Sequence, residues 1–205
     1  MRGFSLAACA AFALLCPAAA AAADPCELHV WPSTELKSVT EGFLWNRRVN
    51  EAFDPSRGGI ERPKVLDPER QLELIGETKI AEALGLRGAA VVTHAQPLTR
   101  AVAAEKRRHS DSKASCYAEL LIAQAIYDKN WLSGRSLRIM GIYRRFGASD
   151  LPETSFMTWA DEPLTLFPAM KIEDAEGAAR EVEAAYRQTV MEFADYATRP
   201  PGKKR

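Results

Sequence analysis

The sequence lacks the short motifs that identify common enzyme classes. It contains no Gly-x-Ser-x-Gly elbow, no His-Glu-x-x-His zinc motif and no glycine-rich phosphate loop. Histidine is scarce as well, with three residues in a chain of 205. The sequence therefore identifies no catalytic residue, and we expect neither a cofactor nor a bound metal.

An excess of charge of one sign is also lacking. The chain carries 27 Lys and Arg residues against 27 Asp and Glu residues. Without its first 23 residues, which include Arg2, its net charge is about −1. Such a chain has no overall attraction for nucleic acid, which we do not expect as a partner, and any electrostatic recognition has to be local.

Long hydrophobic runs are absent beyond the amino terminus, so we predict no transmembrane segment in the mature chain. Residues 1–3 supply a positive charge, residues 4–15 form an uncharged apolar run, and an Ala-x-Ala cleavage site follows at residues 21–23. Twelve residues rise about 18 Å as a helix, which is too short for a bilayer core of about 30 Å. We predict a signal peptide over residues 1–23 and export to the periplasm.

Lipid attachment is the alternative interpretation of the amino terminus. Residues 6–9, Leu-Ala-Ala-Cys, have the spelling of a lipobox, but the apolar run follows this cysteine where it should precede it. Cys16 follows the run, with a bulky leucine before it. A lipidated outer-membrane accessory protein therefore remains a second hypothesis.

Cysteine is sparse, and its number points to a disulfide. Four cysteines occur, and cleavage after residue 23 removes two of them. The remaining pair, Cys26 and Cys116, is predicted to form a disulfide, because exported proteins oxidise paired thiols. An oxidised pair cannot bind zinc as thiolates, which disfavours a site built with His29 and His109.

The first half of the mature chain has the pattern of a strand, a helix and a second strand. Residues 26–31 alternate, with Glu27, His29 and Trp31 on one face. Asp67 precedes Pro68 as an N-cap, and apolar residues then recur at helical spacing as far as residue 85. Residues 89–94 are predicted to form a short buried strand. The stretch between residues 41 and 64 is predicted to be a long, partly irregular basic connection.

The second half indicates a hairpin and a closing helix. Residues 117–128 fit either a helix or a strand, and the turn residues that follow favour a strand paired with residues 136–146. Residues 156–167 suit an edge strand or an ordered loop. A helix is predicted over residues 174–197, and residues 199–205 are predicted to form a disordered basic tail.

We therefore predict a single domain over residues 24–198. Its fold class is α/β, with α+β also possible, and consists of one mixed sheet with helices packed on it. The element order is strand, helix, strand, hairpin, helix, with a βαβ crossover in the first half.

This order resembles small periplasmic α/β domains of outer-membrane assembly factors. The curli-secretion lipoprotein and the amino-terminal domain of the propeller protein of the Tol–Pal system belong to that class, in which a helix closes with a Leu-Gly turn, as at residues 83–86. The chain also resembles uncharacterised secreted bacterial proteins that share its residues 26–32 and 115–120. The resemblance implies a binding or scaffolding role in cell-envelope assembly or maintenance.

One carboxylate and one group of cations are the candidate functional residues. Glu119 lies in an apolar run, where burial would raise the pKa of an acid, although pairing with an arginine of the same sheet is the simpler interpretation. It is the acid we would choose for the alternative of a periplasmic hydrolase with a carboxylate or histidine site.

A set of arginines is the more suggestive feature. Arg138 and Arg144 share one face of a predicted strand, where they could contact an envelope protein or an anionic envelope component. The exposed turn around Trp131 could add an aromatic anchor. The candidate binding residues are Arg107, Arg108, Arg138, Arg144, Arg145 and Trp131.

Overall fold

The computed structural model describes residues 26–41, 47–50, 65–130 and 132–199. Residues 1–25 and 200–205 lie outside this part, as do Trp131 and much of the predicted basic connection. The strands are β1 (Glu27–Trp31), β2 (Leu36–Glu41), β3 (Arg47–Asn50), β4 (Ala90–Thr93), β5 (Tyr117–Asn130), β6 (Gly134–Phe146) and β7 (Pro152–Leu164). The helices are α1 (Pro68–Gly76), α2 (Ile80–Ala83), α3 (Arg100–Ala104), the 3-10 turn η2 (Ile172–Asp174) and α4 (Ala175–Thr198).

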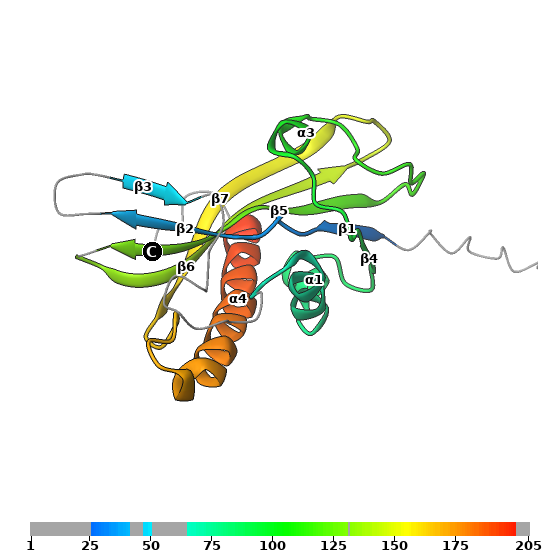
Figure 1. The fold of residues 1–205 in the computed structure, drawn as a ribbon. Coiled ribbons are helices and arrows are strands. Elements are labelled where there is room, and N and C mark those ends of the chain that lie inside the picture. The colour runs from blue at the N-terminus through cyan, green and yellow to red at the C-terminus, as the bar shows by residue number, and fades with distance from the viewer. Residues whose placement is uncertain (1–25, 42–46, 51–64, 131, 200–205) are drawn as a thin grey trace, which may run out of the picture.

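These strands form one mixed sheet around the long strand β5. On one side, β1 pairs in parallel with the first half of β5, and β2 pairs in parallel with its second half. On the other side, β6 and then β7 follow in antiparallel order. β4 extends the sheet beyond β1, and β3 extends it beyond β2. The structure therefore has the predicted fold class, a mixed sheet with packed helices (Figure 1).

The connection from β1 to the parallel strand β4 passes through α1 and α2. Asp67 caps α1 as predicted, since its side chain accepts a hydrogen bond from the backbone N–H of Arg70 at 2.8 Å. The predicted continuous helix is instead two helices, because α1 ends at Gly76 and α2 begins at Ile80. Gly85 then takes a φ of 75°, the left-handed conformation that glycine adopts without steric cost and that commonly closes a helix.

The hairpin prediction is confirmed, and the ambiguous stretch is a strand. β5 and β6 pair from Tyr117↔Phe146 to Asn130↔Gly134, with a register shift between Ile122 and Gln124. β7 is the edge strand anticipated around residues 156–167. Strand formation leaves each side chain on one of two faces, so the alternation of β6 decides which arginines can meet.

The larger core lies on the face of the sheet that α4, α1 and α2 cover (Figure 1). Val182, Tyr186, Val190 and Phe193 of α4 are buried there, as the predicted apolar face of that helix requires. None of the helices in the described ranges is both long and apolar enough to cross a membrane.

A smaller core lies on the opposite face of the sheet. Trp31, Leu121 and Ile142 of three adjacent strands pack there against Ala103 of α3. Cys26 and Cys116 form the predicted disulfide where β1 and β5 begin, with 4.6 Å between their Cα atoms. The same end is joined by a hydrogen bond from the N–H of Glu27 to the carbonyl of Cys116 at 2.9 Å.

Two local predictions are corrected. The strand over residues 89–94 is not buried, because β4 is at the edge of the sheet and Val91 is 42% exposed. The sequence shows only a short apolar run here, and such a run does not distinguish a strand at the edge of a sheet from one in its centre. The connection expected after residue 41 is also more regular than predicted, because residues 47–50 form β3.

Candidate functional site

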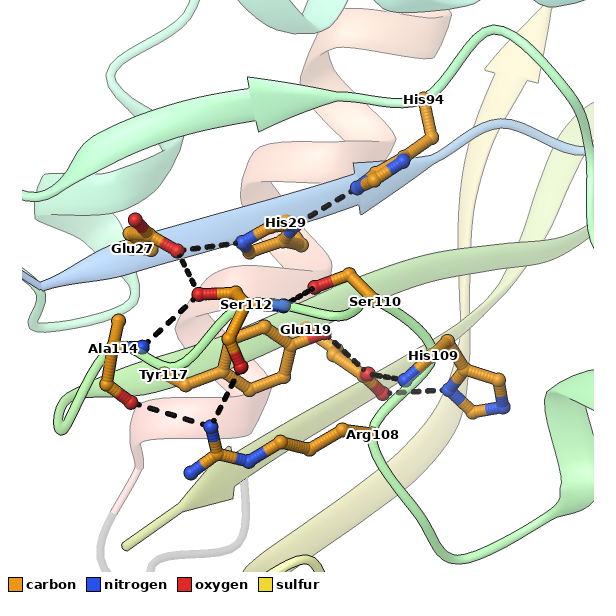
Figure 2. Close-up of polar contacts among 10 residues, drawn as sticks. All are labelled: Glu27, His29, His94, Arg108, His109, Ser110, Ser112, Ala114, Tyr117 and Glu119. Carbon is orange, nitrogen blue, oxygen red and sulfur yellow. Dashed lines mark hydrogen bonds and ion pairs between the residues drawn. The ribbon is translucent and has the colours of Figure 1, made fainter.

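The three histidines lie on the face of the sheet opposite α4, where the loop of residues 105–116 covers the strands and contributes His109. This loop runs from α3 to the disulfide and crosses β1, β5 and β6. Figure 2 shows the polar side chains by which the loop contacts β1 and β5. Ser112 bonds to Glu27 of β1, and His109 bonds to Glu119 of β5. Arg108 donates to the carbonyl of Gly147, just after β6.

A histidine–carboxylate pair, His29 with Glu27, belongs to a chain of four side chains. Nε2 of His29 lies 2.9 Å from Oε2 of Glu27, and its Nδ1 lies 2.8 Å from Nε2 of His94. The same carboxylate oxygen of Glu27 accepts a hydrogen bond from the hydroxyl of Ser112. The ring of His94 stacks on Trp31 with 4.0 Å between centroids and 2° between planes. Strand alternation predicts that Glu27, His29 and Trp31 share a face, and the structure confirms it.

The contacts of this chain assign its protons. A carboxylate accepts, so Nε2 of His29 carries a proton and donates it to Glu27. In the neutral ring Nδ1 of His29 is then an acceptor, and Nε2–H of His94 donates to it. The hydrogen bonds from His29 and Ser112 lower the pKa of Glu27, which keeps that carboxylate ionised. Burial, reinforced by the neighbouring His29, lowers the pKa of His94.

The second pair is buried completely. The side chains of His109 and Glu119 are 1% and 0% exposed, and Nδ1 of His109 lies 2.9 Å from Oε2 of Glu119. The other carboxylate oxygen accepts from the backbone N–H of His109 at 2.6 Å and from the hydroxyl of Tyr117 at 2.8 Å. Nε2 of His109 lies 2.8 Å from the carbonyl oxygen of Val102.

This arrangement makes His109 an imidazolium. Both ring nitrogens of His109 contact oxygen atoms that accept hydrogen bonds, so each of these nitrogens carries a proton. The oxygen atoms of Glu119 contact donors, as those of an ionised carboxylate do. Burial lowers the pKa of His109, but the hydrogen bonds to Glu119 and to the carbonyl of Val102 outweigh it, and the pKa is raised. The pair is therefore a buried ion pair.

Arg144 adds a second cation to this ion pair. Its Nη1 lies 3.7 Å from Oε2 of Glu119, and its Nη2 donates to the carbonyl of Ala103 at 2.6 Å. The side chain is 4% exposed, and Nε and Nη1 have no hydrogen-bond partner among the described residues. Pairing of Glu119 with an arginine of the same sheet, the simpler of the two interpretations of this acid, is what the structure shows.

Arg108 joins two parts of the loop to the residue that follows β6. Its guanidinium lies 4.8 Å from the centre of the Tyr117 ring and 5.8 Å from that of Phe146. It donates to the carbonyl of Gly147 at 2.6 Å and to the carbonyl of Ser112 at 3.2 Å. These contacts use the charge and the planar fork of the arginine to fix backbone inside the protein.

The remaining candidate arginines are accessible and lie apart from one another. Arg138 is on the same face of β6 as Arg144, as predicted, but its charge contacts Asp128 at 3.1 Å and the ring of Trp159 at 5.2 Å. Arg145 is exposed and, as the next residue along the strand, projects from the other face. Arg107 is exposed in the loop and pairs with Glu105 at 2.5 Å. Trp131 lies outside the described residues.

The chemistry open to this site is limited by the order of its groups. A serine nucleophile needs its hydroxyl beside the imidazole that takes its proton. Here Ser112 contacts Glu27, and His29 lies on the far side of that carboxylate. The hydroxyl of Ser112 also accepts from the N–H of Ala114 at 3.1 Å, as in a local turn. In the described part of the chain, no three acids, histidines or cysteines are placed to hold a metal ion.

A second notable surface is the connection from β7 to α4. Leu166, Met170 and Ile172 are 49%, 81% and 73% exposed within seven residues. Between them, Phe167 and Ala169 are buried, so the segment is anchored in the core. We call the three exposed side chains the apolar turn.

Hydrogen bonds to one carboxylate hold the base of the apolar turn. Glu181 of α4 accepts hydrogen bonds from three backbone N–H groups, those of Thr165 at 2.7 Å, Leu166 at 2.8 Å and Phe167 at 2.7 Å. Burial raises the pKa of Glu181, but these hydrogen bonds outweigh it, and the pKa is lowered. The backbone of residues 165–167, where the apolar turn begins, is therefore held against α4.

The fold and these surfaces define a disulfide-linked, mixed α/β protein, and comparison with known proteins adds little to that class. No family model matches the chain, and no curated protein is similar to it. Among solved structures, a Xanthomonas campestris protein of the DUF330 family has a TM-score of 0.43 at 9% identity, over 83% of this chain and 82% of that one. A Chlamydia trachomatis hypothetical protein has a TM-score of 0.33 at 9% identity, over 84% of this chain and 98% of that one. A Caulobacter crescentus protein named as a candidate lipoprotein has a TM-score of 0.33 at 15% identity, over 80% of this chain and 88% of that one.

Scores this low carry no argument about function. The names of these three structures mention no curli or Tol–Pal factor, so the predicted resemblance to those assembly factors is not shown. The α/β architecture itself is confirmed by the mixed sheet and its packed helices.

Some functional contacts were not accessible from the sequence. His94 and His29 are 65 residues apart, and nothing in their spacing indicates that they touch. Only the pairing of β4 with β1, together with strand parity, places both rings on one face. The sequence does not indicate the apolar turn, because its exposed and buried residues alternate without the regular period of a helix or a strand.

Proposed function

We propose that this protein is an exported envelope protein that acts by binding another protein. The observation that carries the proposal is the apolar turn, in which three large apolar side chains are exposed within seven residues, on a segment anchored by the buried Phe167 and Ala169 and by hydrogen bonds to Glu181. Exposed apolar groups that are held in place lose little conformational entropy on association, which favours a protein contact. Export is supported by the signal sequence over residues 1–23 and by the Cys26–Cys116 disulfide.

Two features favour a protein as the partner and disfavour an anionic envelope component. Of the candidate arginines, Arg108 and Arg144 are committed to contacts inside the protein. The exposed Arg107 and Arg145 lie on different elements, so among the described residues these candidates do not form a continuous basic strip for a polyanion. Binding of an anionic component is one of the outcomes that the test below distinguishes.

The test is cross-linking of the tagged full chain in its own cells. We expect discrete cross-linked partners that are lost when Met170 and Ile172 are both changed to Lys. The matched control is Leu132→Lys, which changes a 76% exposed leucine in the β5–β6 turn. Equal capture by the double variant, or loss only when Arg107 and Arg145 are changed to Glu, would reject the proposal. Intact mass of the purified protein tests export, because cleavage predicts a chain that begins at Asp24 and carries one disulfide.

A hydrolase is the second candidate, and one observation favours it. His94 is half-buried at the end of the Glu27–His29 chain, in the position of a base oriented by a second histidine and a carboxylate. If it is a base, a His94→Gln variant would lose hydrolysis of a chromogenic ester while the partner cross-links remained. No esterase activity in the wild-type protein would remove this candidate.

A further inference from the structure

The strand β4 has one edge that the sheet leaves unpaired. Its other edge pairs with β1, where the N–H groups of Ala90 and His94 donate to the carbonyls of Cys26 and Val30 at 2.8 and 2.9 Å. In a strand successive residues point their backbone groups to opposite edges, so the N–H and C=O of Val91 and Thr93 point away from β1. Among the described strands, none pairs with that side of β4.

A groove lies beside this edge, on the face of the sheet that α1 covers. Its volume is about 700 Å³, and Thr93 and Ala95 line it from the strand side. From the helix side it is lined by Asp67, Pro68, Glu69, Leu72 and Glu73. Val91 and Thr93 share this face, because they pair with the core residues Leu28 and Val30.

The charge of the groove is negative. Asp67, Glu69 and Glu73 line it, and no lysine or arginine of the described residues does. Arg70 of the same helix contacts Glu73 at 2.7 Å and also pairs with Glu183 of α4 at 2.8 Å. Glu69 is exposed and has no ion pair with any described residue. An acidic groove repels an anion and attracts lysine or arginine side chains.

We propose that β4 binds an extended basic peptide segment of a partner protein, which adds to the sheet as a new edge strand. Strand addition supplies main-chain hydrogen bonds, and alternate side chains then supply specificity. Side chains of the added strand opposite Val91 and Thr93 enter the acidic groove and are basic. Those opposite Ala90 and Val92 lie on the other face, where small apolar residues fit. This inference rests on the proposed binding function and names a partner class for it.

The first test uses a fluorescent heptapeptide in which lysine alternates with valine, and a second peptide in which glutamate replaces lysine. We expect the purified disulfide-bonded protein to bind the basic peptide at least tenfold more tightly than the acidic one. Its affinity should fall as salt is added, because the attraction is screened. Equal binding of the two peptides, or no binding of the basic peptide at millimolar concentration, would overturn the inference.

The second test separates the strand edge from the charge. Val91→Pro removes an N–H that β1 does not use, and proline is tolerated at such an edge. We expect it to weaken basic-peptide binding at least tenfold, whereas the control Val91→Thr changes it less than threefold. Replacing Glu69 and Glu73 by Gln should weaken binding and reduce its salt dependence. Binding by Val91→Pro within threefold of wild type would overturn the inference.

A third measurement does not depend on the folding of a variant. Hydrogen exchange of the wild-type protein should show that the amides of Val91 and Thr93 exchange rapidly and are protected when the basic peptide is added. Unchanged exchange at both amides would also overturn strand addition. If envelope cross-linking captures a partner through the apolar turn while these tests fail, the proposed function stands and the β4 inference does not.

Discussion

His29 and His94 form a direct hydrogen bond of 2.8 Å between their imidazole rings, although 65 residues separate them. Such a bond needs one donor and one acceptor, so the pair accommodates one added proton and not two. A second proton would set two N–H groups against each other. The interaction therefore couples the two rings, because only one of them can be an imidazolium while the hydrogen bond is kept.

We expect the stability that depends on His94 to be lost at low pH. The pKa of His94 in the folded protein is lowered, so its contribution is present above the ordinary value of 6.5 and disappears as the pH falls through the folded value. Denaturant unfolding of wild type and His94→Gln between pH 5 and 8 measures this. The difference between the two curves should shrink toward pH 5, and a difference that grows there would contradict the assignment.

The opposite pH dependence is expected for His109. Its folded pKa is raised, so its contribution is fully present below pH 6.5 and is lost as the pH rises through the folded value. Titration followed by the NMR signals of the three imidazoles provides the measurement. We expect His109 to titrate above 6.5 and His94 below it, and the reverse order would show that the proton assignment is wrong.

Glu119→Gln should be strongly destabilising. The substitution leaves the His109 imidazolium and the Arg144 guanidinium buried without a counter-ion, and breaking a buried pair in this way costs about 3–5 kcal/mol. Urea unfolding at pH 7 tests it. The control is Glu105→Gln, which removes an exposed pairing with Arg107 and should leave the urea midpoint nearly unchanged, because water screens an exposed ion pair. Similar losses for both variants would argue against the buried ion pair.

Loss of the disulfide should cost a large part of the folding free energy. Cys26 and Cys116 are 90 residues apart, and for a loop of that size the chain-entropy model gives about 4–5 kcal/mol. We expect the doubly Ser-substituted protein and the reduced wild-type protein to unfold at similarly lower urea concentrations. An unchanged midpoint in both would show that the disulfide does not constrain the unfolded chain as proposed.

Gly141→Ala tests the packing of α4 on the sheet. A Cβ at Gly141 would lie 2.6 Å from two ring atoms of Phe193, so strand or helix has to shift, at a cost of about 1–3 kcal/mol. Combining it with Phe193→Leu should recover part of the loss, which a double-mutant cycle measures. Gly76→Ala is the control, because the added methyl meets no atom within 4 Å. Equal effects at Gly141 and Gly76 would refute this packing.

Much of the fold follows from local patterns. The cap at Asp67, the alternation of β1 and the apolar face of α4 are decided by residues close in sequence, and each was predictable. The hairpin was predictable as well, since turn residues join its strands. The prediction of a single helix was wrong, because the apolar residues of α1 and α2 continue one helical period across residues 77–79, where the structure has a turn.

The sequence by itself determined the pairing of the two remaining cysteines and the α/β class, and it predicts an export signal. These depend on composition, on the number of thiols and on periodicities of two or about 3.6 residues. Only the tertiary structure decided that Glu119 meets His109 as well as Arg144, that His29 meets His94, and that β4 is exposed. Contacts between distant residues depend on strand order and register. A local pattern does not encode that order, because an edge strand and a central strand can have the same sequence.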